Sequence, residues 1–297
     1  MSFTKNLKKE VMEKENGKQC CEVAELAGII AFSSSIKNGY LKITIENRMV
    51  ARRIAHQLKR LYGVQAGIEV KKQGGVRKDD AFIISVASYK DLLERLRLFR
   101  ENICFPDELL TRDCCARAFL KGAFLGGGSV ANPEKRYHLE FVTHYREIGY
   151  AFVKFFERMD IAAHEVQRRG LFVTYFKDCD VICDVLAAAG VNNGVMDIYE
   201  VKVVKEKKNE LNRLNNSECA NICKTAKAAA DQRICIEKIV KTVGIDILPE
   251  SLRKLAEMRM KYPEEGLAQL GQRLNPPIGK SGVNHRMRKI IEISKRY

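Results

Sequence analysis

Two similar segments, 94 residues apart, constrain the fold of this chain more than any other feature. CCEVAELAGIIAFSSSIKNG begins at Cys20, and CCARAFLKGAFLGGGSVANP begins at Cys114. The same spacing joins the pairs Cys20/Cys114, Leu26/Leu120, Gly28/Gly122, Ser35/Ser129 and Asn38/Asn132. Because internal repetition marks a duplicated structural unit, the segments predict two equivalent helices in two similar halves.

The residues after these helices predict the same order of elements in both halves. Alternating apolar and polar residues, as in YLKITIEN, predict strands, and apolar residues at helical spacing predict helices. In the first half we expect helices at 20–32, 49–63 and 89–99, and strands at 40–47, 67–72 and 81–88. In the second half we expect helices at 114–126, 147–159 and 180–189, and strands at 137–144, 162–168 and 171–177. Antiparallel strands with helices on one side make an α+β domain.

The length of 297 residues suggests one larger and one smaller domain. The strand pattern ends near residue 205, and helical patterns follow at about 217–243, 249–262, 264–274 and 281–294. Segment 191–216 fits a strand, a helix or a loop. We therefore expect an amino-terminal extension over 1–19, a duplicated domain over 20–205 with halves of about 20–99 and 114–190, and an all-α domain over 206–297.

The net charge of +15 points to a polyanionic partner. Residues 206–297 carry 19 Lys/Arg against 11 Asp/Glu, so the positive charge is concentrated towards the carboxyl end. Because the sequence shows neither a signal peptide nor an apolar run of ~20 residues, we expect a cytoplasmic, nucleoid-associated protein with no membrane partner.

Ten cysteines raise the question of a metal site or a disulfide framework. Cys179 and Cys183 are four residues apart, as are Cys219 and Cys223, and no CxxC pair occurs. These spacings are not those of zinc sites. We therefore expect buried free thiols in a reducing cytosol and no metal site. We also expect no cofactor, and no small-molecule substrate is evident from the sequence.

The last three helical patterns resemble a helix-turn-helix unit. Leu267, Leu270 and Leu274 form an apolar stripe, and the connector NPPIGK stops the helix and permits a sharp turn. Ser281 is the expected N-cap of the final helix. Val283, Met287, Ile290, Ile291 and Ser294 share the side of that helix that is expected to pack inwards.

The opposite face of the final helix is polar, and it is basic at its start. Because a recognition helix inserts its amino-terminal part into the major groove, we expect this face to contact DNA. The expected contacts to base edges are Ser281, Asn284, His285 and Arg288, and those to phosphates are Lys280, Arg286 and Lys289. A solvated basic helix is the alternative, but the preceding turn and the net charge favour DNA binding.

Further phosphate contacts are possible at the predicted hairpin ends of the duplicated domain. The candidates are Lys71, Lys72, Arg77, Lys78, Arg168 and Arg169. Charged hairpin ends are also ordinary solvated surface. A first domain that binds protein rather than DNA is therefore an equal alternative.

The segment LAGIIAFSS at 26–34 resembles the signature helix of the LAGLIDADG homing endonucleases, and LKGAFLGGG at 120–128 resembles it more loosely. The resemblance implies an (αββαββα)2 fold in which the two helices pack at a pseudo-two-fold axis. Small residues at the contact would be Ala27, Gly28, Gly122 and Ala123. Ser33–Asn38 and Ser129–Asn132 would supply short first strands.

In that nuclease family an acidic residue at the foot of each signature helix holds the catalytic metal. Ser33 and Gly127 stand at the matching positions here, and neither 26–39 nor 114–133 contains a carboxylate. Hard divalent cations need oxygen ligands of this type. We therefore expect a scaffold without catalytic residues and a protein that is not an enzyme.

Three segments resemble the WhiA family of bacterial DNA-binding proteins, which combine a degenerate LAGLIDADG domain with a carboxyl-terminal helix-turn-helix. They are FLKGAFLGGGSVANP (119–133), NRLNNSECANICKTAKAA (212–229) and PPIGKSGVNHRMRKI (276–290). The resemblance implies sequence-specific regulation of transcription in the cell cycle, namely cell division, chromosome segregation or sporulation. The implied partner is double-stranded DNA, with another transcription factor or RNA polymerase as a further candidate.

Two other functions compete with this one. An active endonuclease would need relocated acidic residues, such as Glu46 or Asp178. A non-specific nucleoid or RNA-binding protein would recognise only the shape of a nucleic-acid backbone.

Overall fold

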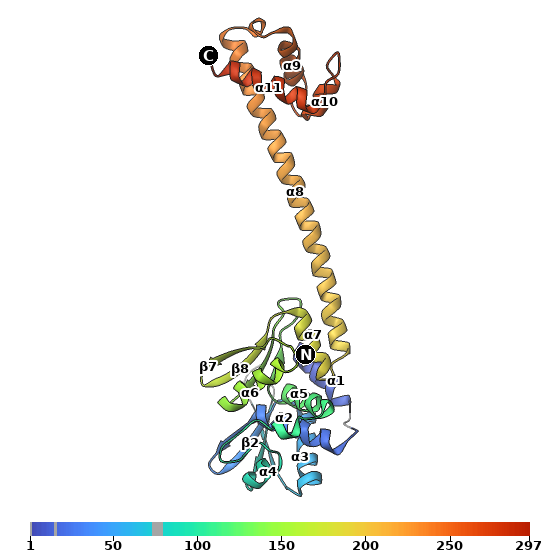
Figure 1. Ribbon diagram of the computed structural model, residues 1–297, viewed down its shortest axis with the longest axis vertical. Coiled ribbons are helices and arrows are strands. Elements are labelled where there is room, and N and C mark those ends of the chain that lie inside the picture. The colour runs from blue at the N-terminus through green and yellow to red at the C-terminus, as the bar shows by residue number, and fades with distance from the viewer. Residues whose placement is uncertain (1, 15–16, 73–79) are drawn as a thin grey trace. The chain divides into compact units, whose positions relative to one another are not determined.

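The chain divides into two compact units, Met1–Lys205 and Glu206–Tyr297. The computed structural model describes residues 2–14, 17–72 and 80–297. Among these residues, both sheets belong to the first unit, whereas helices build the second (Figure 1).

The first half of Met1–Lys205 is built on a four-stranded antiparallel sheet in the order β1-β2-β4-β3. Its strands are β1 (Ser34–Lys37), β2 (Tyr40–Ile45), β3 (Gly67–Lys71) and β4 (Ala81–Val86). Its helices are α2 (Gln19–Ser33), α3 (Arg48–Tyr62) and α4 (Tyr89–Arg95). Leu41, Ile43 and Ile45 of β2 are buried, whereas Tyr40 is 47% exposed, as the alternating pattern predicts.

The second half repeats this arrangement, with a four-stranded sheet in the order β5-β6-β8-β7. Its strands are β5 (Gly128–Val130), β6 (Leu139–Thr143), β7 (His164–Arg168) and β8 (Leu171–Phe176). Its helices are α5 (Asp113–Gly127), α6 (Arg146–Glu157) and α7 (Cys179–Ala188), and a 3-10 turn, η1 (Asp107–Leu109), precedes them. The repeated order of helices and strands confirms the predicted duplicated α+β fold.

Helices α2 and α5 lie side by side, and their backbones approach closely (Figure 1). A Cβ on Gly28 would lie 2.2 Å from the backbone oxygen of Phe119, and one on Gly122 would lie 2.0 Å from the backbone oxygen of Glu25. No side chain fits within such distances, because real Cβ atoms do not approach backbone atoms so closely. The expected close contact of the two helices at small residues is therefore confirmed.

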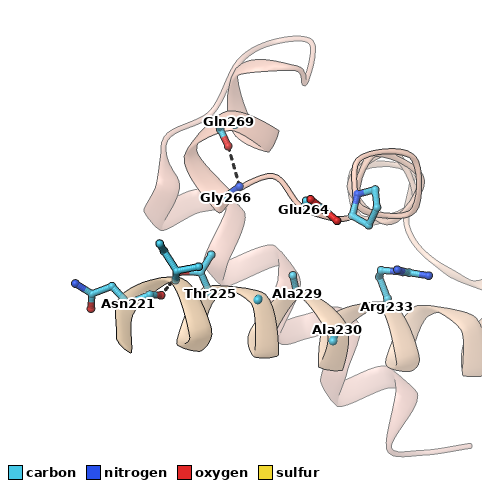
Figure 2. A pocket seen from close by; sticks show the side chains of 11 residues that line it. Asn221, Thr225, Ala229, Ala230, Arg233, Glu264, Gly266 and Gln269 are labelled. Atoms are coloured by element: carbon cyan, nitrogen blue, oxygen red, sulfur yellow. Dashed lines mark hydrogen bonds between the residues drawn. The ribbon is translucent and has the colours of Figure 1, made fainter. Parts of the chain in front are cut away.

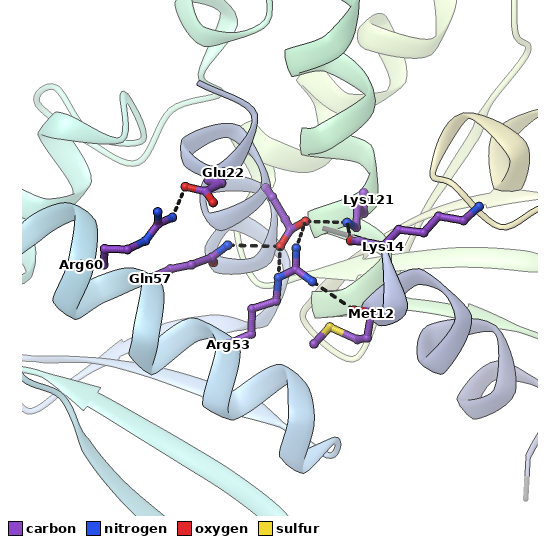
Figure 3. A network of polar contacts seen from close by, with 8 residues as sticks. Met12, Lys14, Glu22, Arg53, Gln57, Arg60 and Lys121 are labelled. Carbon is purple, nitrogen blue, oxygen red and sulfur yellow. Dashed lines mark hydrogen bonds and ion pairs between the residues drawn. The ribbon is translucent and has the colours of Figure 1, made fainter. Parts of the chain in front are cut away.

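A buried carboxylate, Glu25, joins α2 to α3 and α5 (Figure 3). Arg53 Nε lies 2.8 Å from its Oε1 atom, and Lys121 Nζ lies 3.0 Å from its Oε2 atom. Gln57 donates a further hydrogen bond of 3.3 Å to Oε1. Glu25 is 0% exposed, and these donors supply the compensation that a buried charge requires.

Sequence reasoning did not predict the first helix, α1 (Phe3–Glu13), which lies in the segment we expected to be an extension. Leu7 and Val11 of α1 are buried in the core of the first unit. The carboxylate of Glu10 accepts hydrogen bonds from the backbone amides of residues 192, 193 and 194, at the start of α8 (Asn193–Thr242). Glu10 thus satisfies amides that the first turn of a helix leaves without partners.

Helix α8 begins at Asn193, so the ambiguous segment 191–216 is helical for almost all of its length. The second unit continues with η2 (Ile245–Ile247), α9 (Glu250–Lys261), α10 (Leu267–Gln272) and α11 (Lys280–Ser294). Its core joins Ile236 and Ile239 of α8 to apolar residues of these later helices. Among the described residues, none of the helices combines the length and apolar character that a bilayer span requires.

Candidate nucleic-acid interface

A tight turn fixes the start of α11 against α10. The amide of Ile278 donates to the backbone oxygen of Gly271 at 3.0 Å, and a Cβ on Gly271 would lie 2.1 Å from the oxygen of Ile278. Beyond the turn, Val283, Met287 and Ile290 are buried against α9 and α8. The inward face of α11 is the one that helical periodicity predicts.

A second set of contacts holds the segment between α9 and α10. Arg259 is 1% exposed, and its Nη1 atom donates to the backbone oxygens of Glu265 at 2.6 Å and Pro263 at 3.3 Å. Arg273 makes a two-pronged ion pair with the Glu265 carboxylate, with distances of 2.8 Å from Nε and 2.6 Å from Nη2. The hydrogen bond from Arg273 lowers the pKa of Glu265 below its ordinary value.

The opposite face of α11 presents the candidate DNA contacts to solvent. Ser281, His285 and Arg288 are exposed, and Asn284 is half-buried. Lys280 and Lys289 are exposed and Arg286 is half-buried. All seven candidates therefore lie on one helix whose other face anchors it to the core.

The expected N-cap of α11 is wrong. The helix begins at Lys280, its N-cap is Gly279, and no side chain makes the cap hydrogen bond. Ser281 is therefore inside the first turn of the helix, where the residue is exposed. This position leaves Ser281 among the residues at the amino-terminal end of the exposed face.

A groove on the helical unit was not predicted from the sequence (Figure 2). It encloses about 700 Å³ between residues 221–233 of α8 and residues 263–269, which lead into α10. Gln269 Oε1 accepts a hydrogen bond of 2.9 Å from the Gly266 amide at its rim. None of the candidate DNA contacts of α11 lines this groove.

The basic hairpin ends lie at matching places in the two halves. Lys71 ends β3 and Lys72 follows it, and both are exposed. Arg168 and Arg169 are exposed at the turn between β7 and β8, and Arg168 Nη1 lies 4.0 Å from Glu140 Oε2. The candidates Arg77 and Lys78 lie outside the described residues.

The foot of the helix pair, defined here by Ser33 and Gly127, has no space for an acidic side chain at one of its two positions. The hydroxyl of Ser33 donates to the backbone oxygen of Ile29 at 2.6 Å. A Cβ on Gly127 would lie 2.4 Å from the backbone oxygen of Val142. A carboxylate at residue 127 would therefore require a shift of the backbone.

A lysine occupies the region beside this foot. Lys8 of α1 donates to the backbone oxygen of Leu125 at 3.1 Å and lines a cavity of about 740 Å³ together with Gly127 and Glu46. Burial lowers the pKa of Lys8 to about 8, and the charge of Glu46 opposes this shift. Glu46, one of the two relocated acids that an endonuclease could use, therefore faces a cation.

The other candidate acid, Asp178, is the N-cap of α7. Its side chain accepts hydrogen bonds from the amides of Asp180 and Val181, at 2.9 Å and 3.1 Å. This is a structural role that a helix start requires. Asp178 is therefore engaged in holding the start of α7.

The cysteines differ from the sequence expectation in two respects. Cys219 and Cys223 are exposed on α8 rather than buried. The vicinal pairs of the two repeated segments meet, so that the Sγ atoms of Cys20, Cys21, Cys114 and Cys115 all lie within 4.8 Å of one another. Within 2–14, 17–72 and 80–297, these four make up the group of His, Cys, Asp and Glu side chains whose geometry suits a metal ion.

Three thiols of this group have shifted pKa values. Burial raises the pKa of Cys21 to about 11 and that of Cys115 to about 12. The hydrogen bond with Cys115 lowers the pKa of Cys20. The signal that could have located this group is the repeat itself, because paired helices bring equivalent residues together.

Three family models match successive parts of the chain. The WhiA N-terminal LAGLIDADG-like domain matches residues 19–99, the WhiA LAGLIDADG-like domain matches 116–208, and the WhiA C-terminal HTH domain matches 211–294. A probable cell division protein WhiA of Alkaliphilus metalliredigens is 37% identical over 311 residues, which cover 100% of this chain and 98% of the relative. The chain belongs to the WhiA family.

Other WhiA proteins are similar to this chain in sequence or in fold. A probable cell division protein WhiA of Clostridium botulinum is 37% identical over 308 residues, covering 99% of this chain and 98% of the relative. The crystal structure of full-length WhiA from Thermotoga maritima superposes with a TM-score of 0.60 at 27% identity, covering 100% of this chain and 99% of that one. The N-terminal LAGLIDADG domain of a WhiA protein superposes with a TM-score of 0.55 at 22% identity, covering 67% of this chain and 96% of that one. The family expected from the three quoted segments is confirmed.

Proposed function

We propose that this protein is a non-catalytic, sequence-specific DNA-binding regulator of transcription that acts in cell division, chromosome segregation or sporulation. One observation carries the proposal. Helix α11 exposes polar and basic residues at its amino-terminal end while its other face is anchored in a helix-turn-helix unit. The names of the relatives, which are probable cell division proteins, support the cellular process. The corresponding location is the cytoplasm, in association with the nucleoid.

The test first requires the DNA sequence that the protein binds, because specificity is the difference between the affinity for this sequence and the affinity for others. A genome-wide map of bound fragments followed by one footprint supplies a duplex, and a scrambled duplex of equal length is the reference. We expect the affinity for both to fall steeply with salt, since phosphate contacts release counterions. Equal affinity for the two duplexes, or for RNA, would instead establish the non-specific alternative.

Arg288→Ala tests the role of the α11 face. If Arg288 contacts a base edge, its loss should weaken binding to the specific duplex by about 1–3 kcal/mol and leave binding to the scrambled duplex nearly unchanged. Lys295→Ala is the matched control, because it removes the same charge just after the other end of α11. Equal effects of the two variants on the specific duplex would remove the amino-terminal face of α11 from base recognition.

The hairpin ends of the first unit form a separate part of the proposal. Replacement of Lys71, Lys72, Arg77, Lys78, Arg168 and Arg169 by serine should lower both the affinity and its salt dependence if they contact phosphates. Unchanged affinity and salt dependence would assign this unit to protein contacts, for which another transcription factor or RNA polymerase is the candidate partner.

The absence of catalysis is tested on supercoiled plasmid. The proposal expects no relaxed or linear product in the presence of Mg²⁺ or Mn²⁺. The two residues at the foot support this expectation, because the Ser33 hydroxyl is bonded to its own helix and Gly127 is enclosed by backbone. Cleavage that a chelator abolishes would establish the endonuclease alternative.

A further inference from the structure

Four sulfur atoms converge at the head of the helix pair, defined here by Cys20, Cys21, Cys114 and Cys115. Helix α2 begins at Gln19 and α5 begins at Asp113, so each helix carries its two cysteines in its first turn. The Sγ atoms of Cys114 and Cys115 are 4.0 Å apart, and all four Sγ atoms lie within 4.8 Å of one another. The sulfurs therefore come as two equivalent pairs, one from each half.

We propose that the head binds one zinc ion, coordinated by the four cysteine sulfurs and joining the amino ends of α2 and α5. Tetrahedral zinc with Zn–S bonds of ~2.3 Å places its sulfurs about 3.8 Å apart. The widest pair, at no more than 4.8 Å, needs to close by about 1 Å. Small rotations of four short side chains supply such a change.

The ligand set selects the type of ion. Four thiolates favour soft or borderline metals over Mg²⁺ and Ca²⁺, which prefer oxygen. The compact spacing favours a single ion over a polynuclear iron–sulfur cluster, because several irons and inorganic sulfides would hold the cysteine sulfurs further apart. A closed set of four protein ligands is typical of a structural rather than a catalytic zinc site.

The surroundings of the head provide access and charge compensation. Cys20 and Cys115 line an open cavity of about 520 Å³, and Arg112 lines it beside them. One zinc with four thiolates carries two negative charges, which Arg112 and the positive ends of two helix dipoles oppose. Cys21 and Cys115 are 8% and 4% exposed, whereas Cys20 and Cys114 are half-buried, so the ion would lie at the edge of the core with one side open to the cavity.

The first measurement is the metal content of the full-length chain, purified without chelator and with a thiol reductant. We expect one zinc per chain by inductively coupled plasma mass spectrometry. Replacement by cobalt should give sulfur-to-cobalt charge transfer and the intense d–d bands of a tetrahedral thiolate site. Because coordinated thiols lose their protons, the apparent affinity should fall as the pH falls.

Cys20→Ser/Cys115→Ser should abolish the cobalt d–d bands and reduce the bound zinc at least tenfold. The matched control is Cys219→Ser/Cys223→Ser, which removes two exposed thiols of α8 and should retain one zinc per chain. Equal metal content in the two variants would overturn the proposal.

A measurement on the unmodified chain covers the case in which the serine variant does not fold. Alkylation followed by peptide mass spectrometry should label the half-buried head cysteines, Cys20 and Cys114, only after zinc is removed with a chelator, whereas Cys219 and Cys223 should be labelled in both states. Labelling of the head that is indifferent to the chelator would overturn the proposal. Disulfides among the head cysteines in anaerobically purified protein, with no bound zinc, would overturn it as well.

Discussion

The head and the foot of the α2–α5 pair differ in what the close approach of the two helices leaves accessible. At the foot, backbone oxygens of both halves, those of Phe32 and Val142, enclose Gly127, and Ser33 is bonded to its own helix. At the head, side chains from both halves meet, first the four thiols and then, one turn further along α2, the buried Glu25. The two ends of the same pair of helices therefore differ completely. One end is packed backbone without room for a further side chain, and the other is a cluster of reactive side chains.

Among changes at the head and the foot, Glu25→Gln is expected to lower the free energy of unfolding most. It keeps the shape of the side chain and removes its charge. Lys121 and Arg53 would then face each other without the carboxylate between them. Loss of one partner from a buried ion pair costs about 3–5 kcal/mol in the free energy of unfolding. Urea denaturation measures this loss. The exposed Glu257 of α9 provides a control, since Glu257→Gln should change stability by less than about 0.5 kcal/mol.

Gly122→Ala should have the next largest effect, because it tests the contact that both ends share. The added Cβ would lie 2.0 Å from the backbone oxygen of Glu25, so the helices must separate. We expect a loss of about 1–3 kcal/mol, typical of overpacking. Gly67→Ala is the control, since nothing lies within 4 Å of its added Cβ. Equal stabilities of the two variants would contradict the close packing of α2 on α5.

Lys8→Met tests the electrostatics of the foot. The pKa of folded Lys8, about 8, is below the ordinary lysine value of 10.5, so the unfolded chain binds more protons between these values. The contribution of Lys8 to the free energy of unfolding therefore rises with pH through this window, by about 1 kcal/mol between ~pH 7 and ~pH 9. Denaturation at several pH values should show this rise in the parent and in Lys9→Met, which alters an exposed lysine, but not in Lys8→Met.

Ser33→Asp is expected to have no effect on DNA cleavage. One restored carboxylate cannot bind a catalytic metal while Gly127 has no room for a second and Lys8 places an ammonium nearby. Plasmid nicking by this variant should equal that of Ser35→Asp, a neighbouring serine in β1. Mg²⁺-dependent nicking by Ser33→Asp alone would show that the foot still accepts a metal.

Most of the duplicated fold could be predicted from the sequence, because its signals are local and occur twice. Leu41, Ile43 and Ile45 mark the buried face of β2 by simple alternation, and the spacing of the repeat gives the second half its register. The close contact at Gly28 and Gly122 was inferred from a family resemblance. Residue size alone could not have distinguished a helix contact from an exposed glycine.

Other features were missed for different reasons. Helix α1 had a usable signal, since Phe3, Leu7 and Val11 recur every four residues, but Lys-rich surroundings masked it. The true cap of α11 is Gly279, which has no side chain to mark it. The cysteines at the head are separated by most of a domain along the chain, and the usual metal-binding spacings describe ligands within one loop. Only the pairing of α2 with α5 brings them together.

The close packing at Gly28 and Gly122, where a side chain on either residue would clash with the other helix, also affects how the two halves can change during evolution. Duplication ordinarily makes one copy redundant, so that it can accumulate substitutions while the other retains the original role. Here the backbone of each half packs against a glycine of the other half and excludes a larger residue there. Neither half is therefore redundant, and the substitutions that one half can accept are limited by the backbone of the other.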